Sequence, residues 1–97
     1  MTITNLQLPV SETELSYILR KQGVMRAKLF GSYARGEQTP KSDLDIYVEC
    51  RPGTSLFDIF DLQAELEKRA NTKVDLVTKI NRHFAEYIEP DFIDFRL

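Results

Sequence analysis

Two aspartates, Asp43 and Asp45, are the residues of this sequence best suited to chemistry. Residues 44–50, Leu-Asp-Ile-Tyr-Val-Glu-Cys, alternate between apolar and polar side chains, which predicts a half-buried strand. Positions two apart on a strand face the same side, about 6.5–7 Å apart at the backbone. Their carboxylates can therefore converge on one cation or span two, and Mg²⁺ prefers hard oxygen ligands of this kind. Alternatively, both are solvated carboxylates on an exposed strand face.

A third carboxylate, Asp75, lies in a second strand-like run over residues 73–77. Val74 and Leu76 mark one face of that run as buried, so Asp75 is expected on the other face. If the two strands are neighbours, their axes lie about 4.8 Å apart and all three carboxylates can meet. Three carboxylates at one place repel one another unless cations neutralise them. By itself, Asp75 also fits an isolated exposed residue at the mouth of a strand.

Gly31 and Ser32 follow a short apolar run, where a strand turns into a possible helical turn. Glycine lets a phosphate approach the backbone, and amides at a helix start form an anion-binding corner together with a serine hydroxyl. Arg35, one turn later, can reach such a phosphate. Plainer roles fit as well: Gly31 serves the turn, Ser32 caps the helix, and Arg35 pairs with Glu37 or Asp43.

The elements that position these residues alternate between helix and strand. Capping patterns mark helices that begin at Ser11 and Ser55, and Asn81 is a candidate cap for a last helix that Pro90 interrupts. The strands are expected over residues 26–30, 44–50 and 73–77. This order predicts an α/β (α+β) domain with a small mixed β-sheet. The connection between the first two strands is too short for a comfortable parallel crossover, so that pair is expected to be antiparallel.

Two apolar patterns accompany these elements. In the helix after Ser55, apolar residues recur at helical spacing: Leu56, Ile59, Phe60, Leu66 and Ala70. From residue 84 to the end the chain is rich in aromatic and aliphatic residues mixed with acids. Part of that segment must pack on the sheet, and the rest either forms an interface with a basic-rimmed partner or completes the core.

Composition limits the class of protein. The 97 residues are 42% hydrophobic and 29% charged, with a net charge of −2, as in an ordinary globular domain without a strongly basic face for duplex nucleic acid. The only cysteine, Cys50, has no disulfide partner within the chain and is expected in the core, while the only histidine, His83, makes a zinc site improbable. Without a membrane-spanning apolar run or a signal peptide, a cytoplasmic location is expected.

Together, these motifs resemble a known signature. Gly31-Ser32, separated by ten residues from Asp43-x-Asp45, resembles the pattern of the nucleotidyltransferase superfamily that includes DNA polymerase beta. Ala-Arg-Gly at 34–36 and Ser-Asp-x-Asp at 42–45 look like its smallest branch, the minimal nucleotidyltransferases (MNT). The run around Asp75 is similar to the strand with that family's third carboxylate. The resemblance implies a polymerase-beta-like core with helices packed on one side of the sheet, in a single MNT domain over residues 1–97.

The resemblance also implies roles for individual residues. Asp43 and Asp45 would hold Mg²⁺, as two ions, on the triphosphate of ATP. Asp75 would help to bind metal and act as the base toward an attacking hydroxyl. The nucleotide-binding candidates are then Gly31, Ser32, Arg35 and Ser42. Of these, Ser42 also fits a plain turn residue.

In size and motifs the chain resembles MNT proteins that form the antitoxin half of a type VII-like toxin–antitoxin pair. In such pairs the toxin is a helical HEPN-domain ribonuclease, and some of the antitoxins transfer AMP to a tyrosine hydroxyl of the toxin. The resemblance therefore implies a Mg²⁺-dependent adenylyltransferase that neutralises a HEPN toxin within a hetero-oligomer. Two alternatives stay open. One is an antitoxin that acts by occlusion without catalysis. The other is a nucleotidyltransferase for a small molecule, against which the lack of a substrate domain counts.

Overall fold

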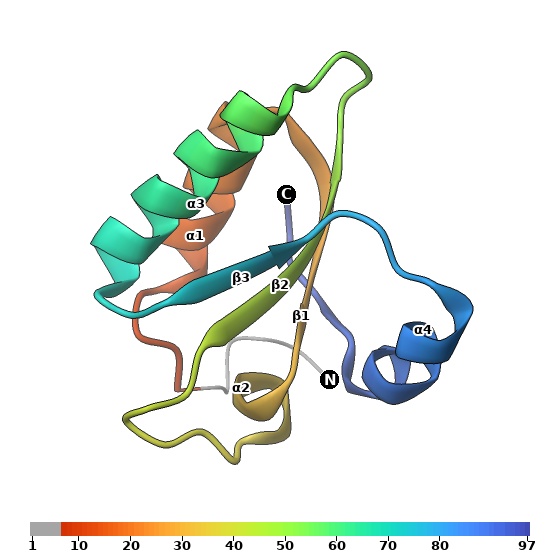
Figure 1. The fold of residues 1–97 in the computed structure, drawn as a ribbon. Helices are drawn as coiled ribbons and strands as arrows, with labels where there is room; N and C mark the ends of the chain where they lie inside the picture. Colours follow the sequence, from red (N-terminus) through yellow and green to blue (C-terminus); the bar gives the residue numbers. More distant parts are fainter. Residues whose placement is uncertain (1–6) are drawn as a thin grey trace.

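The computed structural model describes residues 7–97. Helices and strands alternate along the chain, as the sequence predicts (Figure 1). In chain order they are α1 (Glu12–Lys21), β1 (Val24–Phe30), α2 (Ser32–Arg35), β2 (Leu44–Cys50), α3 (Leu56–Ala70), β3 (Val74–Val77), α4 (Arg82–Ile88), the 3-10 helix η2 (Glu89–Asp91) and β4 (Ile93–Asp94).

The strands form one mixed sheet in the order β3-β2-β1-β4. β1 pairs with β2 and with β4 antiparallel, and β2 pairs with β3 parallel. Helix α3 makes the crossover between the two parallel strands, as such a connection requires. The mixed sheet and the antiparallel first pair confirm the expectation. The fourth strand was not expected, because two residues are too few to show an alternating pattern and only their pairing with β1 defines them.

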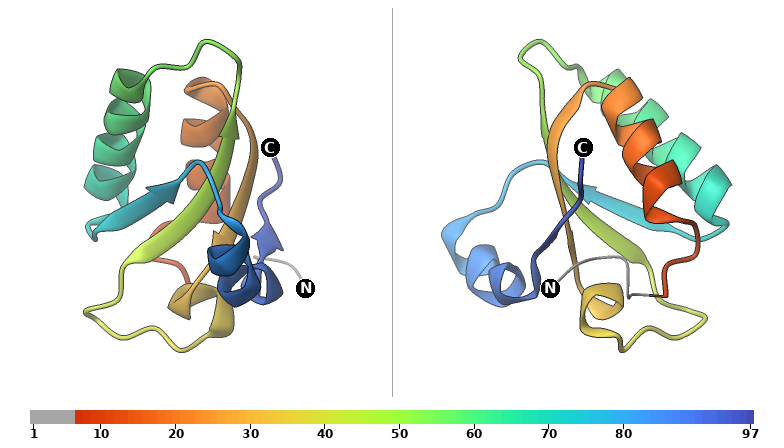
Figure 2. Two further views of the ribbon diagram at one scale, coloured as in Figure 1. Left: turned by 45° about the vertical axis from the view of Figure 1, so that its right-hand side comes forward. Right: turned by 180° about the vertical axis from the view of Figure 1, so that it is seen from behind.

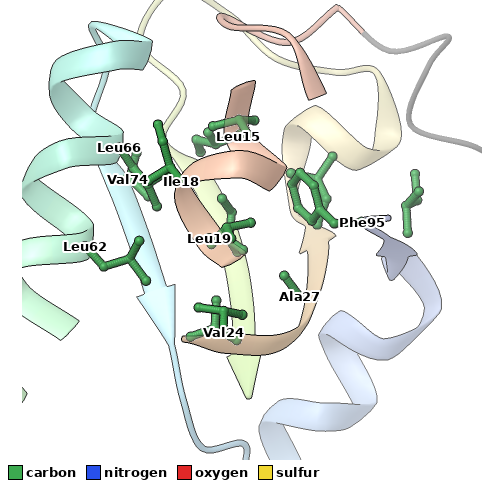
Figure 3. Packing of buried hydrophobic residues seen from close by; sticks show 14 of the residues in the cluster. Leu15, Ile18, Leu19, Val24, Ala27, Leu62, Leu66, Val74 and Phe95 are labelled. Atoms are coloured by element: carbon green, nitrogen blue, oxygen red, sulfur yellow. The ribbon is translucent and has the colours of Figure 1, made fainter. Parts of the chain in front are cut away.

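Helices α1 and α3 lie side by side over one face of the sheet, whereas α4 and η2 lie toward its other face (Figures 1 and 2). The core fills the space between α1, α3 and the sheet (Figure 3). Its fully buried members are Leu15, Ile18, Leu19, Leu29, Leu44, Ile46, Leu62, Leu66, Val48 and Val74. This core layer covers the apolar face of β2. The opposite, polar face, which carries the aspartates, therefore remains available for the site.

Capping fixes where the helices begin. Ser55 and Asp58 form the complete reciprocal capping box that the sequence predicts at the start of α3. Ser11 accepts the backbone N–H of Glu14 at 3.2 Å, but the return half of that box is not formed. The Glu14 carboxylate instead accepts a hydrogen bond from Arg69 of α3 at 2.6 Å, so it joins the two helices.

The expected apolar face of α3 is partly wrong. The buried residues are Leu62, Leu66 and Ala70, spaced four apart, whereas Leu56 and Phe60 are exposed. At about 100° per residue, Phe60 lies about 160° around the helix from Leu62, so both cannot face the sheet. The helix instead buries against the sheet the row of Leu62, Leu66 and Ala70, which runs along its later half.

The C-terminal segment ends its helix where Pro90 predicts, in η2 directly after α4. The ring of Phe92 stacks on Tyr47 with centroids 5.7 Å apart and meets Phe30 edge-on at 6.0 Å. Ile93 and Phe95 are buried members of the core cluster, and Ile93 pairs with Leu29 of β1. Part of this segment therefore packs on the sheet, as expected.

Candidate active site

Gly31 connects β1 to α2 in a backbone conformation that favours glycine, with φ +78° and ψ −157°. A Cβ built on Gly31 would collide with Oδ2 of Asp45. The sequence suggests that this glycine leaves room for a phosphate. The structure adds a second reason, because the missing side chain also leaves room for a candidate catalytic carboxylate.

Ser32 begins α2 directly beside Gly31, and its backbone carbonyl accepts the N–H of Glu37 at 2.9 Å. Within residues 7–97, no hydrogen bond occupies its hydroxyl. The next turn closes at Gly36, which is left-handed with φ +72°. The short helix therefore presents its first backbone N–H groups and one hydroxyl at the end of β1, next to the position of Asp45.

Asp45 and Asp75 are direct register partners on the parallel strands β2 and β3. Partial burial, then the charges of Asp75 and Asp43, raise the pKa of Asp45 to about 6, and a hydrogen bond with Asp75 adds to the shift. The positive charge of Arg35 opposes it. The expectation that separate strands bring these two carboxylates together holds in this structure.

Asp43 directly precedes β2, and its charge contributes to the raised pKa of Asp45. Oδ2 of Asp43 lies 3.9 Å from Nζ of the exposed Lys73. Over residues 7–97, no three acidic, histidine or cysteine side chains converge as a ready-made metal site. An exposed pair of this length contributes little stability, so Asp43 can leave Lys73 at small cost.

The donors nevertheless suit a hard divalent cation. Asp45 and Asp75 supply carboxylate oxygens, and Asp45 carries an unfavourable charge that a cation would neutralise. Asp43, two residues before Asp45, is a third carboxylate close enough to affect the pKa of Asp45. A nearby cation would therefore be held by Asp45 and Asp75, with Asp43 joining after its side chain turns away from Lys73.

Arg35 lies one turn beyond Gly31, with its guanidinium between two carboxylates. Nε donates to Glu37 at 2.7 Å and Nη1 donates to Asp91 of η2 at 2.7 Å. Of the two partners considered from sequence, Glu37 is present and Asp43 is replaced by Asp91. A guanidinium has five N–H donors, so Nη2 keeps donors for an incoming anion.

Ser42 has a structural role in the loop before β2. Its hydroxyl accepts the backbone N–H of Thr39 at 2.8 Å, and its carbonyl accepts the hydroxyl of Thr72 at 3.3 Å. These contacts agree with the turn interpretation and hold the starts of β2 and β3 together.

Cys50, expected in the core, is partly buried and packs against the core cluster. Burial raises the pKa of its thiol, which disfavours a nucleophilic role.

Sequence reasoning missed the aromatic wall beside the carboxylates. The alternation along 44–50 predicts Tyr47 on the same strand face as Asp45. It does not predict that Phe92 stacks on Tyr47, or that Phe30, the register partner of Asp45, contacts Phe92. Nζ of Lys28 lies over the ring of Phe92, 5.3 Å from its centroid. The only available signal was the aromatic content of the C-terminal segment.

The fold and this arrangement define a class: a small α/β enzyme domain in which a glycine-serine turn and paired strand carboxylates lie together. The family model of polymerase beta nucleotidyltransferases matches residues 13–91. The chain therefore belongs to this nucleotidyltransferase family, and its fold is that of the family's minimal members.

Relatives support this assignment. One from Methanocaldococcus jannaschii, named as a candidate protein adenylyltransferase, is 50% identical over 66 residues, which cover 68% of this chain and 71% of the relative. The protein adenylyltransferase MntA of Thermococcus cleftensis is 42% identical over 57 residues, 59% of this chain and 58% of the relative. The protein is accordingly a nucleotidyltransferase with relatives named as protein adenylyltransferases.

Solved structures agree. A structure described as a minimal nucleotidyltransferase candidate superposes with a TM-score of 0.75 at 30% identity, covering 84% of this chain and 86% of that one. A toxin–antitoxin structure with AMP-PNP gives a TM-score of 0.63 at 30% identity, covering 70% of this chain and 56% of that one.

No helix within residues 7–97 has the length and apolar character needed to cross a membrane.

Proposed function

We propose that this chain transfers AMP from ATP to a hydroxyl of a HEPN-type toxin and so acts as its antitoxin. The observation that carries the proposal is the Asp45–Asp75 register pair placed against the side-chain-free Gly31. The relative named MntA and the toxin–antitoxin structure with a bound ATP analogue support the choice of nucleotide and of partner class.

In the proposed reaction, the acceptor oxygen attacks the α-phosphorus of ATP. The new bond joins that oxygen to phosphorus, the bond to the bridging oxygen of the β-phosphate breaks, and pyrophosphate leaves. Asp75 accepts the proton of the attacking hydroxyl. The Gly31–Ser32 turn binds the β- and γ-phosphates through its N–H groups and the Ser32 hydroxyl, with Arg35 beside it.

Asp43, Asp45 and Asp75 would hold the Mg²⁺, which supplies positive charge to the triphosphate and the leaving pyrophosphate. The chain's own contribution is to place Asp45 and Asp75 side by side near the starts of β2 and β3. Because Asp45 has a pKa of about 6, it is ionised at neutral pH and available as a ligand.

A direct experiment mixes the purified toxin with this chain, ATP and Mg²⁺, and measures the toxin by intact-mass and peptide mass spectrometry. The expected result is a toxin that gains AMP on a tyrosine. The double variant Asp43→Asn, Asp45→Asn is the control without transfer. An unmodified toxin that is nevertheless inhibited by the wild-type chain would contradict the enzymatic function.

Occlusion without catalysis is the second candidate, and exposed apolar residues on α3 favour it. They lie on α3, which covers one face of the sheet (Figure 2), whereas Asp45 alternates along β2 with the buried Leu44 and Ile46 and so belongs to the other face. In cells that express the toxin, the same double variant separates the two functions. Lost protection supports catalysis, whereas full protection by the folded variant supports occlusion.

A further inference from the structure

The first two turns of α3 present large apolar side chains to solvent. Leu56 is 72% exposed, Phe57 79% and Phe60 59%. The core row of α3 lies on the other side of the helix, so these three residues contribute nothing to the interior of the domain. A surface of this kind is typical of a site that another molecule covers. Leu56, Phe57 and Phe60 are called here the α3 apolar surface.

A groove of about 460 Å³ adjoins this surface. Its apolar lining includes Leu56, Ile59 and Met25, and Met25 is itself 54% exposed. The groove lies between the start of α3 and the C-terminal ends of β2 and β3. It is large enough for one aromatic or branched aliphatic side chain of a binding partner.

The charge around the α3 apolar surface selects among partners. Between Leu56 and Glu67, every charged residue of α3 is acidic, and Asp58 and Asp61 lie among the exposed apolar side chains. Acidic groups there disfavour nucleic acid and anionic lipid. A second copy of the chain would place its own Asp58 and Asp61 against the same acids. A protein with lysine or arginine beside an apolar side chain is complementary.

The groove lining also includes Arg51 and Lys79, which lie outside α3. A partner's basic side chains would therefore lie on the α3 side, beside Asp58 and Asp61. Cys50, at the end of β2, also lines the groove, whereas Asp45 lies near the start of that strand. The groove and the carboxylates are thus at opposite ends of β2, and Figure 1 shows α2 and the start of α3 at opposite ends of the sheet.

We propose that the α3 apolar surface and its groove are the docking site for the protein partner, which inserts an apolar side chain flanked by lysine or arginine. This inference rests on the proposed function, because the partner is the toxin that receives AMP. It goes further by separating the residues that hold the toxin from those that modify it.

Calorimetry with the full chain and the purified HEPN-type toxin tests the proposal. Phe57→Ser combined with Phe60→Ser is expected to raise the Kd by about 30-fold or more, as for the central residues of an interface. Tyr87→Ser is the matched control, because Tyr87 is an equally exposed aromatic residue on α4, 81% exposed. It should leave the Kd within about twofold. Circular dichroism confirms that each variant is folded.

A charge-reversal pair tests the acidic rim. Asp61→Lys should slow association and raise the Kd, whereas Glu86→Lys, at an exposed position of α4, should not. Equal affinities of the wild type and the Phe57, Phe60 variant for the toxin would overturn the docking site. Concentration-dependent dimers in sedimentation that the same variant abolishes would overturn it in favour of a second copy.

The outcomes distinguish this proposal from the proposed function. A complex that forms and is weakened by the α3 variants, but shows no AMP transfer, would refute the enzymatic function and leave the docking site standing. AMP transfer that persists unchanged in the α3 variants at limiting toxin concentration would refute the docking site and leave the enzymatic function standing. Failure of the wild-type chain to bind the toxin would overturn the docking site.

Discussion

Arg35 and Asp91 lie 56 positions apart in the chain, and their side chains meet at 2.7 Å between Nη1 and Oδ2. The contact joins the short helix after Gly31 to η2 in the C-terminal segment. The Asp91 side chain is only 16% exposed. This pair therefore ties the segment that carries the aromatic wall to the turn expected to bind phosphate.

Removing that tie should loosen the C-terminal segment. We expect Asp91→Asn to lower the free energy of unfolding by about 1 kcal/mol, because the charge-assisted hydrogen bond that Arg35 donates to this partly shielded carboxylate becomes a weaker, neutral one. Hydrogen exchange should speed up around Phe92. The control is Asp94→Asn, whose partner Lys28 is 3.7 Å away and whose side chain is largely exposed. Equal effects of both variants on thermal unfolding would show that the Arg35–Asp91 pair has no special role.

Asp45 should make stability depend on pH. Its folded-state pKa, about 6, lies above the value of 3.8 expected in the unfolded chain, so the folded state binds the proton more tightly. The free energy of unfolding should therefore fall as pH rises from about 4 to 6. Asp45→Asn abolishes this loss and should gain about 1 kcal/mol at pH 7.5 in metal-free buffer, after allowance for solvent screening. The gain should vanish near pH 4.

Denaturant titrations of both proteins across this pH range measure the effect. Adding Mg²⁺ at neutral pH should narrow the difference, since a cation stabilises the ionised carboxylate of the wild type only. A variant that is less stable than the wild type at pH 7.5 without metal would mean that Asp45 is a structural carboxylate.

Gly31 and Gly36 provide a matched pair for testing the close approach to Asp45. Both have positive φ, +78° and +72°, but only at Gly31 would a Cβ collide with another residue. Gly36→Ala should cost about 1 kcal/mol for left-handed strain alone. Gly31→Ala should cost more, about 2–3 kcal/mol, and should weaken ATP binding because Asp45 must move. Thermal unfolding and nucleotide titration check both, and equal costs would contradict the steric role of Gly31.

The three carboxylates should fail in different ways. Asp43→Asn and Asp45→Asn remove charge that holds the cation, so ATP binding should no longer depend on Mg²⁺. Asp75→Asn should retain nucleotide binding but lower the rate of AMP transfer by about 10²- to 10⁴-fold, as for loss of a general base. Calorimetry with and without EDTA measures the first effect, and single-turnover transfer measures the second. Equal ATP affinity of the wild type in Mg²⁺ and in EDTA would refute the site.

The local features were predictable because short-range periodicity encodes them. Alternation along 44–50 placed Asp45 and Tyr47 on one strand face, the Ser55–Asp58 pair marked the start of α3, and Pro90 marked the end of α4. Each depends on residues within about four positions of one another, so backbone geometry alone determines it. The spacing of Gly31-Ser32 from Asp43 likewise indicated the family.

Only the tertiary structure decided which of these features meet. The register of β2 against β3 sets Asp45 opposite Asp75, and the C-terminal segment brings Asp91 to Arg35 and Phe92 to Tyr47. It also decided which side of α3 faces the sheet and therefore left Phe57 exposed. Contacts between distant segments depend on how whole faces pack, and that choice minimises exposed apolar surface over the entire chain rather than within any one helix or strand.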